Sequence, residues 1–192
     1  AFLSKFLYQH PELYSKKNVI DIGCGPGTQG IIMAKFGAKS VTLSDINPKA
    51  VSNAKENIKR LNLKNVEIYK SDLFSDLPQN KKYDVIVFNH PYFAIEPRDF
   101  EGSDDIMIKR CMLGGTELIK QFFKQSLKFL NQNGIIIMPY FPFAGRENNP
   151  ANHIKNYGLK ITKEVKGRVE PQENLNLGEL GETSIYIISK YG

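Results

Sequence analysis

Residues 21–27 read Asp-Ile-Gly-Cys-Gly-Pro-Gly, with glycines at three alternate positions directly after an apolar run that contains Val19 and Ile20. A glycine has no Cβ, so such a stretch can turn sharply and lay its backbone against a ligand. The apolar run predicts a buried parallel strand, and residues 30–34 predict a helix after the turn. A strand, a glycine-rich turn and a helix N-terminus together form a binding edge with unpaired amides.

Three further polar stretches follow apolar runs. Asp45 follows residues 40–44, Ser71-Asp72 follows residues 65–69, and Asn89-His90-Pro91-Tyr92 follows residues 83–88. Ligands of an open parallel sheet bind beyond the carboxyl ends of its strands, so we expect these residues and the glycine turn to line one crevice. Asp45 stands 22 residues after Gly23, where an acidic residue can accept both hydroxyls of a ribose.

An acidic residue at this position also fits NAD, but two features of the turn argue against a dinucleotide. Thr28 occupies the position of the third glycine in the Gly-x-Gly-x-x-Gly fingerprint. Pro26 removes one amide from the turn that would hold a pyrophosphate. The sequence therefore predicts a nucleoside ligand without a phosphate.

The elements that must position these residues alternate between strands and helices. The strands are expected at residues 19–22, 40–44, 65–69, 83–88, 134–138, 159–165 and 183–189. Helices are expected within residues 1–17, where one would cover an edge of the domain, and at 30–34, 48–61, near 105–112, from Gly114-Gly115 to Asn133-Gly134, and from Asn149-Pro150 to Gly158. Such alternation predicts an α/β fold with a parallel sheet between helices, and the last two strands, which lack a helix between them, predict an antiparallel hairpin.

Composition fits a single globular domain over residues 1–192, with 1–17 as a leading helical segment. Of the 192 residues, 41% are hydrophobic and 24% are charged, and no apolar run has the length of a membrane span. Cys24 and Cys111 have neither metal-site spacing nor a disulfide framework, so we expect no metal and a reducing, cytoplasmic setting.

The formal net charge of +6 is compatible with an acidic partner such as RNA. The basic residues are scattered, however, apart from one loose set at Lys155, Lys160, Lys163, Lys166 and Arg168. This pattern is more typical of a solvated face than of a nucleic-acid groove.

The chain resembles the class I S-adenosylmethionine-dependent methyltransferases. Residues 21–27 resemble the first motif of that family, residues 45–48 (Asp-Ile-Asn-Pro) the second, and residues 71–74 (Ser-Asp-Leu-Phe) the third. The resemblance implies a Rossmann-like three-layer sandwich whose seven-stranded, mostly parallel sheet has an antiparallel last strand. It also implies that the cofactor is S-adenosyl-L-methionine.

The same resemblance implies roles for single residues. The glycine turn would hold the methionine part of the cofactor, Asp45 the ribose hydroxyls, Ile46 one adenine face, and Asp72 with Leu73 the adenine amine and ring. Asp21 would point toward the cofactor's amino group or brace the turn, and Asp72 read alone fits a helix N-cap. The implied cofactor-binding residues are Asp21, Gly23, Cys24, Gly25, Gly27, Asp45, Ile46, Asp72, Leu73 and Asn89.

Residues Asn89, His90, Pro91 and Tyr92 resemble the Asn-Pro-Pro-Tyr motif of amino-group methyltransferases, and we expect them to form the catalytic set. The Asn89 side-chain oxygen and a loop carbonyl can each accept an N–H of a planar amide, which aims the nitrogen lone pair and favours its developing positive charge. Pro91 restricts His90 to an extended backbone, and Tyr92 can lie on the flat acceptor group. Proline is usual at position 90, and a histidine that fills the loop is favoured over a general base.

The resulting hypothesis is an N-methyltransferase that acts on a planar amide or amine of a macromolecule, most like the protein glutamine methyltransferases. Residues 112–115, followed by Glu117-Leu118, also resemble those enzymes. Most of them carry a helical substrate domain ahead of this fold, and here only residues 1–17 precede the first strand. The alternatives are a ribosomal or transfer RNA base methyltransferase and a non-catalytic binding protein on the same fold. Each reading implies a macromolecular partner, protein or RNA, and no membrane.

Overall fold

The computed structural model describes residues 2–91, 115–142, 145–168 and 181–191. Within them one seven-stranded sheet has the order β3-β2-β1-β4-β5-β7-β6. Its strands are β1 (Asn18–Ile22), β2 (Ser40–Asp45), β3 (Val66–Lys70), β4 (Tyr83–Phe88), β5 (Leu130–Tyr140), β6 (Leu159–Arg168) and β7 (Glu182–Lys190).

Only β7 runs against its neighbours. Strands β3, β2, β1, β4 and β5 pair in parallel, whereas β7 pairs antiparallel with both β5 and β6. The predicted Rossmann-like sheet with an antiparallel last strand is therefore confirmed, and so is the hairpin of the last two strands. Because five parallel strands share one direction, the ends of β1, β2, β3 and β4 meet at a single edge of the sheet.

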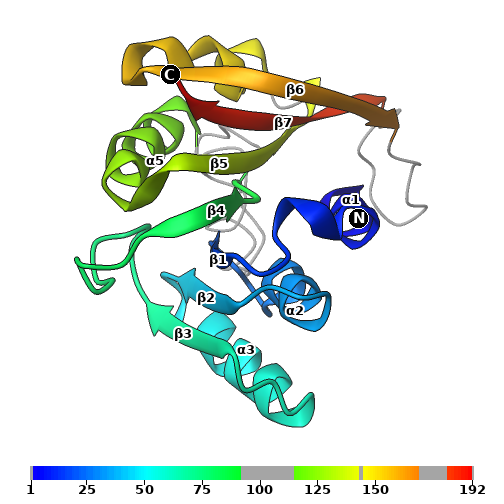
Figure 1. The fold of residues 1–192 in the computed structure, drawn as a ribbon. Coiled ribbons are helices and arrows are strands. Elements are labelled where there is room, and N and C mark those ends of the chain that lie inside the picture. The colour runs from blue at the N-terminus through cyan, green and yellow to red at the C-terminus, as the bar shows by residue number, and fades with distance from the viewer. Residues whose placement is uncertain (1, 92–114, 143–144, 169–180, 192) are drawn as a thin grey trace, which may run out of the picture.

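Each face of the sheet carries its own apolar core because successive strand residues point to opposite sides. Ile20 and Ile22 pack with α5 (Gly115–Phe129) on one face, while Val19 packs with α1 (Phe2–Gln9) and α2 (Thr28–Lys35) on the other. Figure 1 shows this arrangement of three layers, with α5 on one side of the sheet and α1, α2 and α3 (Pro48–Arg60) on the other.

The start of α3 follows the predicted local chemistry. Asn47 is its N-cap, the Asn47 side chain accepts the backbone N–H of Lys49, and Pro48 occupies the first helical position. Proline suits this position because its missing N–H would have no helical partner. This cap fixes where the chain leaves β2, directly after Asp45.

Two expectations about helices need correction. The helix after Gly115 ends at Phe129 instead of Asn133-Gly134, because Leu130 already pairs with Tyr83 as the first residue of β5. The leading helix lies against a face of the sheet rather than covering an edge of the domain. Its residues Leu3, Phe6 and Leu7 belong to the same core as Val19.

The segment from Asn149-Pro150 to Gly158 is helical as predicted, but it forms the 3-10 turns η5 (Pro150–Asn152) and η6 (Ile154–Tyr157). The helix expected near 105–112 lies outside the described residues. None of the helices that the structure describes is long and apolar enough to cross a membrane.

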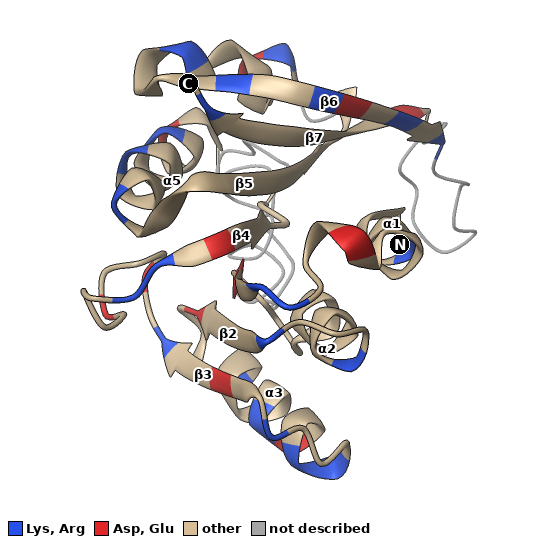
Figure 2. Ribbon diagram, in the orientation of Figure 1, with Lys and Arg blue, Asp and Glu red and all other residues tan. Residues whose placement is uncertain are grey.

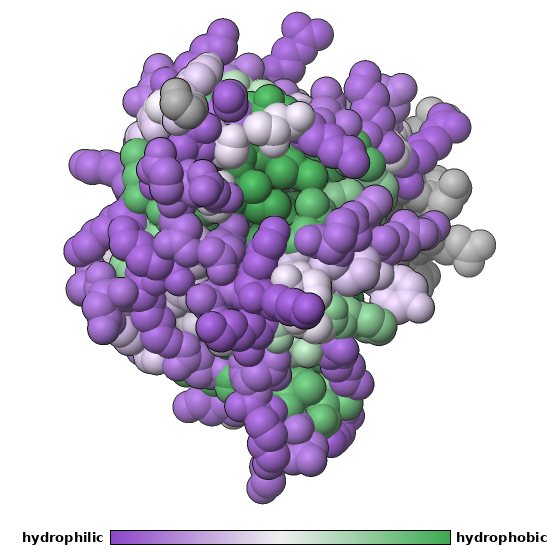
Figure 3. Space-filling model, in the orientation of Figure 1, coloured by the Kyte–Doolittle hydropathy of each residue, from purple (hydrophilic) through white to green (hydrophobic). Residues whose placement is uncertain are grey.

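Charged residues are distributed over several elements. Figure 2 shows lysine and arginine on α3, α5, β6 and the turn before β4, with acidic residues among them. Figure 3 shows a mostly hydrophilic surface whose most prominent apolar region lies below β6, over β7 and β5, with smaller apolar patches lower in the view. Half-buried Ile135 of β5 and Val165 of β6 pack against the core on the α1 side of the sheet.

Candidate functional site

The glycine turn after β1 has the backbone that its sequence predicts. Gly23, Gly25 and Gly27 have φ angles of 62°, 55° and 88°, a region that residues with a Cβ rarely adopt. The Gly27 amide donates to the Cys24 carbonyl at 2.9 Å, and Gly27 then caps α2. A Cβ at Gly25 would meet no atom within 4 Å, so the middle of the turn faces open space.

Asp45, at the end of β2, forms hydrogen bonds both to the glycine turn and to the chain after β3. The Gly25 amide donates to Asp45 Oδ2 at 2.8 Å, and the Asn47 amide donates to Asp45 Oδ1 at 2.8 Å. The Ser71 amide donates to the Asp45 carbonyl at 3.0 Å. Ile46, the next residue, leaves 61% of its surface exposed, which is unusual for a large apolar side chain.

The turn after β3 contains a strained residue. Leu73 has a φ of 49°, although its side chain is buried, and a branched apolar residue in this region is an outlier. The Leu73 carbonyl accepts the Ser71 hydroxyl at 3.0 Å and the Ser44 hydroxyl at 3.4 Å. Asp72 is exposed, and residues 71–82 form turns, so Asp72 caps no helix.

At the end of β4, Phe88 connects the glycine turn to the predicted catalytic residues. A Cβ on Gly23 would lie 3.5 Å from the Phe88 ring, which also stacks on Phe122 of α5 with ring centroids 4.4 Å apart. Half-buried Asn89 follows directly, and then come His90 and Pro91. Tyr92 lies outside the described residues.

His90 is only 1% exposed and lies beside the Phe88 ring, with ring centroids 5.8 Å apart. Burial lowers the pKa of His90 from 6.5 to about 4, because an imidazolium loses its hydration there. His90 is therefore neutral at physiological pH and a weak base. This environment is what a loop-filling histidine would have.

Asp21 is completely buried below the glycine turn. Its Oδ2 accepts the Gly30 amide of α2 at 3.0 Å, whereas Oδ1 has no hydrogen-bond partner among the described residues. Burial raises the pKa of Asp21 from 3.8 to about 7, the Gly30 amide opposes this rise, and the nearby Asp45 charge adds to it. Asp21 thus braces the first turn of α2 with one oxygen and leaves the other for a donor that the described chain does not supply.

Cys24 is 3% exposed, and its thiol donates to the Gly25 carbonyl at 3.5 Å. Burial, together with the Asp21 and Asp45 charges, raises the pKa of Cys24 well above its usual range. The thiol is therefore protonated at physiological pH. In the glycine turn it acts as a small apolar side chain rather than as a nucleophile.

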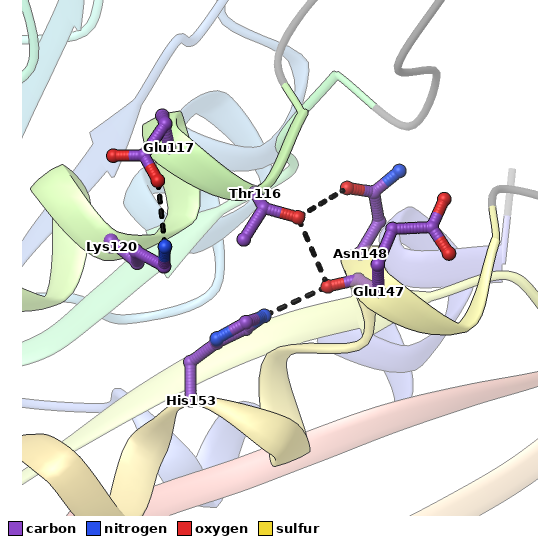
Figure 4. Close-up of polar contacts among 6 residues, drawn as sticks. All are labelled: Thr116, Glu117, Lys120, Glu147, Asn148 and His153. Atoms are coloured by element: carbon purple, nitrogen blue, oxygen red, sulfur yellow. Dashed lines mark hydrogen bonds and ion pairs between the residues drawn. The ribbon is translucent and has the colours of Figure 1, made fainter.

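A second group of polar contacts connects the start of α5 to the chain that follows the end of β5. The Thr116 hydroxyl donates to the Glu147 carbonyl at 3.2 Å and to Asn148 Oδ1 at 3.3 Å, and His153 Nε2 donates to the same Glu147 carbonyl at 2.8 Å. Figure 4 shows how these contacts connect α5 to the chain after β5. They stabilise the fold, and His153 takes part as a structural donor.

The contacts bring most of the predicted cofactor set together. Gly25 touches Asp45 directly, Ser71 bonds the Asp45 backbone, and Gly23 stands beside Phe88, which precedes Asn89. Ser44 and Phe88 had no predicted role in the site, and Ser71 was expected only to line the crevice. Only Ser71 had a signal, because it lies within the Ser-Asp-Leu-Phe motif.

Comparisons with known proteins point to one family. Residues 13–177 match a family described as a methyltransferase domain. The chain is 33% identical over 186 residues to a protein of Methanocaldococcus jannaschii provisionally named a protein N5-glutamine methyltransferase, covering 86% of this chain and 90% of that protein. It is 30% identical over 175 residues to release factor glutamine methyltransferase of Borreliella burgdorferi, covering 88% of this chain but only 59% of that protein.

Solved structures share the fold at lower identity. The ribosomal protein L11 methylase of Lactobacillus delbrueckii subsp. bulgaricus has a TM-score of 0.68 and 20% identity, over 99% of this chain and 78% of that one. The structure of SMU.776 complexed with SAH has a TM-score of 0.71 and 14% identity, over 98% of this chain and 49% of that one.

The chain belongs to the methyltransferase family, because that family matches most of its length and a relative at 33% identity covers 86% of it. The prediction of an S-adenosylmethionine-dependent methyltransferase is thereby confirmed for the class of enzyme. Which acceptor it methylates is a separate question.

Proposed function

We propose that the chain is an N-methyltransferase whose acceptor is the side-chain amide of a glutamine in a protein. The observation that carries the methyltransferase part of this proposal is the continuous set of contacts from Gly25 through Asp45 to Leu73, with Asn89 on the adjoining strand end. The relative from Methanocaldococcus jannaschii, which this chain covers over 90% of its length, supports glutamine as the acceptor. The match over residues 13–177 supports one methyltransferase domain.

The residues present fit S-adenosylmethionine. A carboxylate has about four acceptor sites, and backbone amides occupy two of those on Asp45, so two remain for the two ribose hydroxyls. Exposed Ile46 offers an apolar surface for an adenine face, and exposed Asp72 offers an acceptor for the adenine amine. The free oxygen of Asp21 and the open space at Gly25 suit the cationic methionine part.

When bound, the cofactor supplies an electrophilic methyl group on a sulfonium. The chain's own contribution is to orient a weak nucleophile, because the lone pair of an amide nitrogen is delocalised. Asn89 accepts one amide N–H, and a carbonyl of the loop after β4 accepts the other. This arrangement favours positive charge on the nitrogen. It also holds the nitrogen in line with the methyl group, and such fixed orientation can lower the reaction barrier by about 7–11 kcal/mol in favourable cases.

His90 supports this loop by filling the space beside Phe88. Its pKa of about 4 makes it a poor proton acceptor near neutral pH, and proton loss from a methylated amide nitrogen needs no strong base. The residues proposed to act on the acceptor are therefore Asn89 and Tyr92, while Pro91 fixes the backbone of the loop between them.

The experiment uses S-adenosylmethionine that carries a labelled methyl group, together with a cell lysate that lacks this activity. We expect label in protein, released by protease, and N5-methylglutamine after complete digestion. Label that is released by ribonuclease instead would support an RNA base as acceptor, which the net charge of +6 favours. If neither protein nor RNA carries label although the chain binds the cofactor, the result would support the alternative of a non-catalytic binding protein.

The matched control is the Asn89→Ala variant. We expect it to bind S-adenosylmethionine about as well as the natural chain but to lose methyl transfer by a factor of about a hundred or more, as removal of one positioned hydrogen-bond partner does elsewhere. Unchanged turnover of this variant would remove Asn89 from the mechanism. A loss of cofactor affinity as large as the loss of methyl transfer would instead indicate that Asn89 binds the cofactor.

A further inference from the structure

Two buried serines converge on one backbone carbonyl. The hydroxyls of Ser71 and Ser44 both donate to the Leu73 carbonyl oxygen, at 3.0 Å and 3.4 Å. Their side chains are 2% and 0% exposed, so neither hydroxyl is available to bulk water. A carbonyl oxygen has two lone pairs, and this pair of donors can use both of them.

The residue that the serines hold is the strained one. A φ of 49° at Leu73 places its Cβ close to backbone atoms, and such a conformation persists only where the surroundings fix it. Ser71 fixes the turn from a second direction, because its oxygen also accepts the Asp76 amide at 3.1 Å. The turn that contains Asp72 and Leu73 is therefore held by side chains rather than by regular secondary structure.

Ser44 also belongs to the glycine turn. Its carbonyl accepts the Cys24 amide at 2.9 Å, while its hydroxyl reaches Leu73. Its neighbour Asp45 makes a parallel pair of contacts, with Gly25 through the carboxylate and with Ser71 through the carbonyl. The last two residues of β2 thus join the two turns to which the methionine part and the adenine are assigned.

We propose that Ser44 and Ser71 are positioning residues for the adenosine part of the cofactor. They keep Leu73 in its left-handed conformation and so present Asp72 and Leu73 to the adenine in advance of binding. This inference rests on the proposed function, because the assignment of Asp72 and Leu73 to the adenine comes from there. Preorganisation of this kind raises affinity because the ordering cost is met in the folded protein before the ligand arrives.

Calorimetric titration of two probes tests the proposal. One probe is S-adenosylmethionine and the other is 5′-methylthioadenosine, which keeps the adenosine but lacks the amino-acid part. We expect Ser71→Ala to weaken both probes by a similar factor of about five, the value of one hydrogen bond. Ser44→Ala has the longer contact, and we expect a smaller loss of about twofold to threefold for both probes.

Ser126→Ala is the matched control. Ser126 is also fully buried and donates one hydrogen bond, to the Phe123 carbonyl at 2.9 Å, but it lies within α5. We expect this variant to lose thermal stability without any change in either dissociation constant. An equal loss of affinity in Ser126→Ala would overturn the proposal, because the effect would then reflect general destabilisation.

A second background tests the strain directly. Glycine adopts a positive φ without steric cost. In a Leu73→Gly chain, the additional Ser71→Ala substitution should therefore change the dissociation constants of both probes by less than about twofold. Unchanged dissociation constants for Ser71→Ala and Ser44→Ala in the natural background would refute the positioning role. If Ser71→Ala does not fold, Ser44→Ala carries the same test. Failure of the natural chain to bind either probe would instead refute the proposed function.

Discussion

Asp21 is a buried carboxyl group whose cost should be visible in the pH dependence of stability. Burial raises its pKa to about 7 in the folded chain, whereas the ordinary value is 3.8. Each pKa unit corresponds to about 1.4 kcal/mol, so the difference amounts to about 4 kcal/mol. The perturbation that reveals it is Asp21→Asn, which keeps an oxygen for the Gly30 amide and cannot ionise.

Proton binding by Asp21 determines whether the unfolding free energy rises or falls with pH. Between pH 3.8 and about 7 the folded chain holds a proton on Asp21 that the unfolded chain releases. The stabilising contribution of protonated Asp21 is fully present below pH 3.8 and is lost as the pH rises through 7. The side-chain amide of the Asp21→Asn variant has no such loss, so the variant should gain stability relative to the natural chain as the pH rises.

Urea unfolding of both chains at pH 4, 6 and 8 measures this effect. The difference in unfolding free energy between variant and natural chain should grow by about 4 kcal/mol from pH 4 to pH 8. Any fixed cost of the buried amide cancels, because it is the same at each pH. A difference that stays constant with pH would refute the reasoning. In an Asp45→Asn background the growth should end at a lower pH and be smaller in total, because the Asp45 charge helps to raise the pKa of Asp21.

Three further predictions concern the scaffold. Gly30→Ala should lower the unfolding free energy by about 1–2 kcal/mol in urea, because the new Cβ would collide with the buried Leu43 side chain, and unchanged stability would contradict that packing. Tyr14→Phe should cost about 1 kcal/mol by the same assay, because it removes the buried 2.8 Å hydrogen bond to the Leu7 carbonyl, and a gain in stability would speak against that bond. The His90 imidazole should titrate near pH 4 by NMR, and a midpoint near 6.5 would show that it is solvated.

Residue types and spacing were enough to predict the sheet, the glycine turn and Asp45, whereas the other proposed cofactor residues came from the resemblance to methyltransferases and stay a prediction. Three glycines at alternate positions need positive φ angles, which is a local property of the chain, and Asp45 follows from the rule that ligands meet the ends of parallel strands. The contact between Gly25 and Asp45 agrees with that reasoning. The catalytic role of Asn89 stays a prediction.

What the sequence could not predict depends on contacts between distant segments. Leu130 fits the helical spacing of the preceding residues, yet its pairing with Tyr83 makes it the start of β5. Nothing in the composition of the Ser71–Phe74 motif indicates that Leu73 takes a positive φ, because hydroxyls from two strand ends impose it. Asp21 had two possible roles, and only the fold shows that one oxygen meets Gly30.

The central claim is that the ends of β1, β2, β3 and β4 form one site for S-adenosylmethionine. The most direct test is calorimetric titration of that cofactor into the natural chain, Asp45→Ala and Asp84→Ala. Asp84 is the matched control, since its carboxylate also accepts a backbone amide, that of Asn18 at 2.9 Å, but near the start of β4. We predict one cofactor per chain, an affinity about tenfold lower or more in Asp45→Ala, and no change in Asp84→Ala. Absence of binding to the natural chain, or equal affinity in all three, would contradict the account.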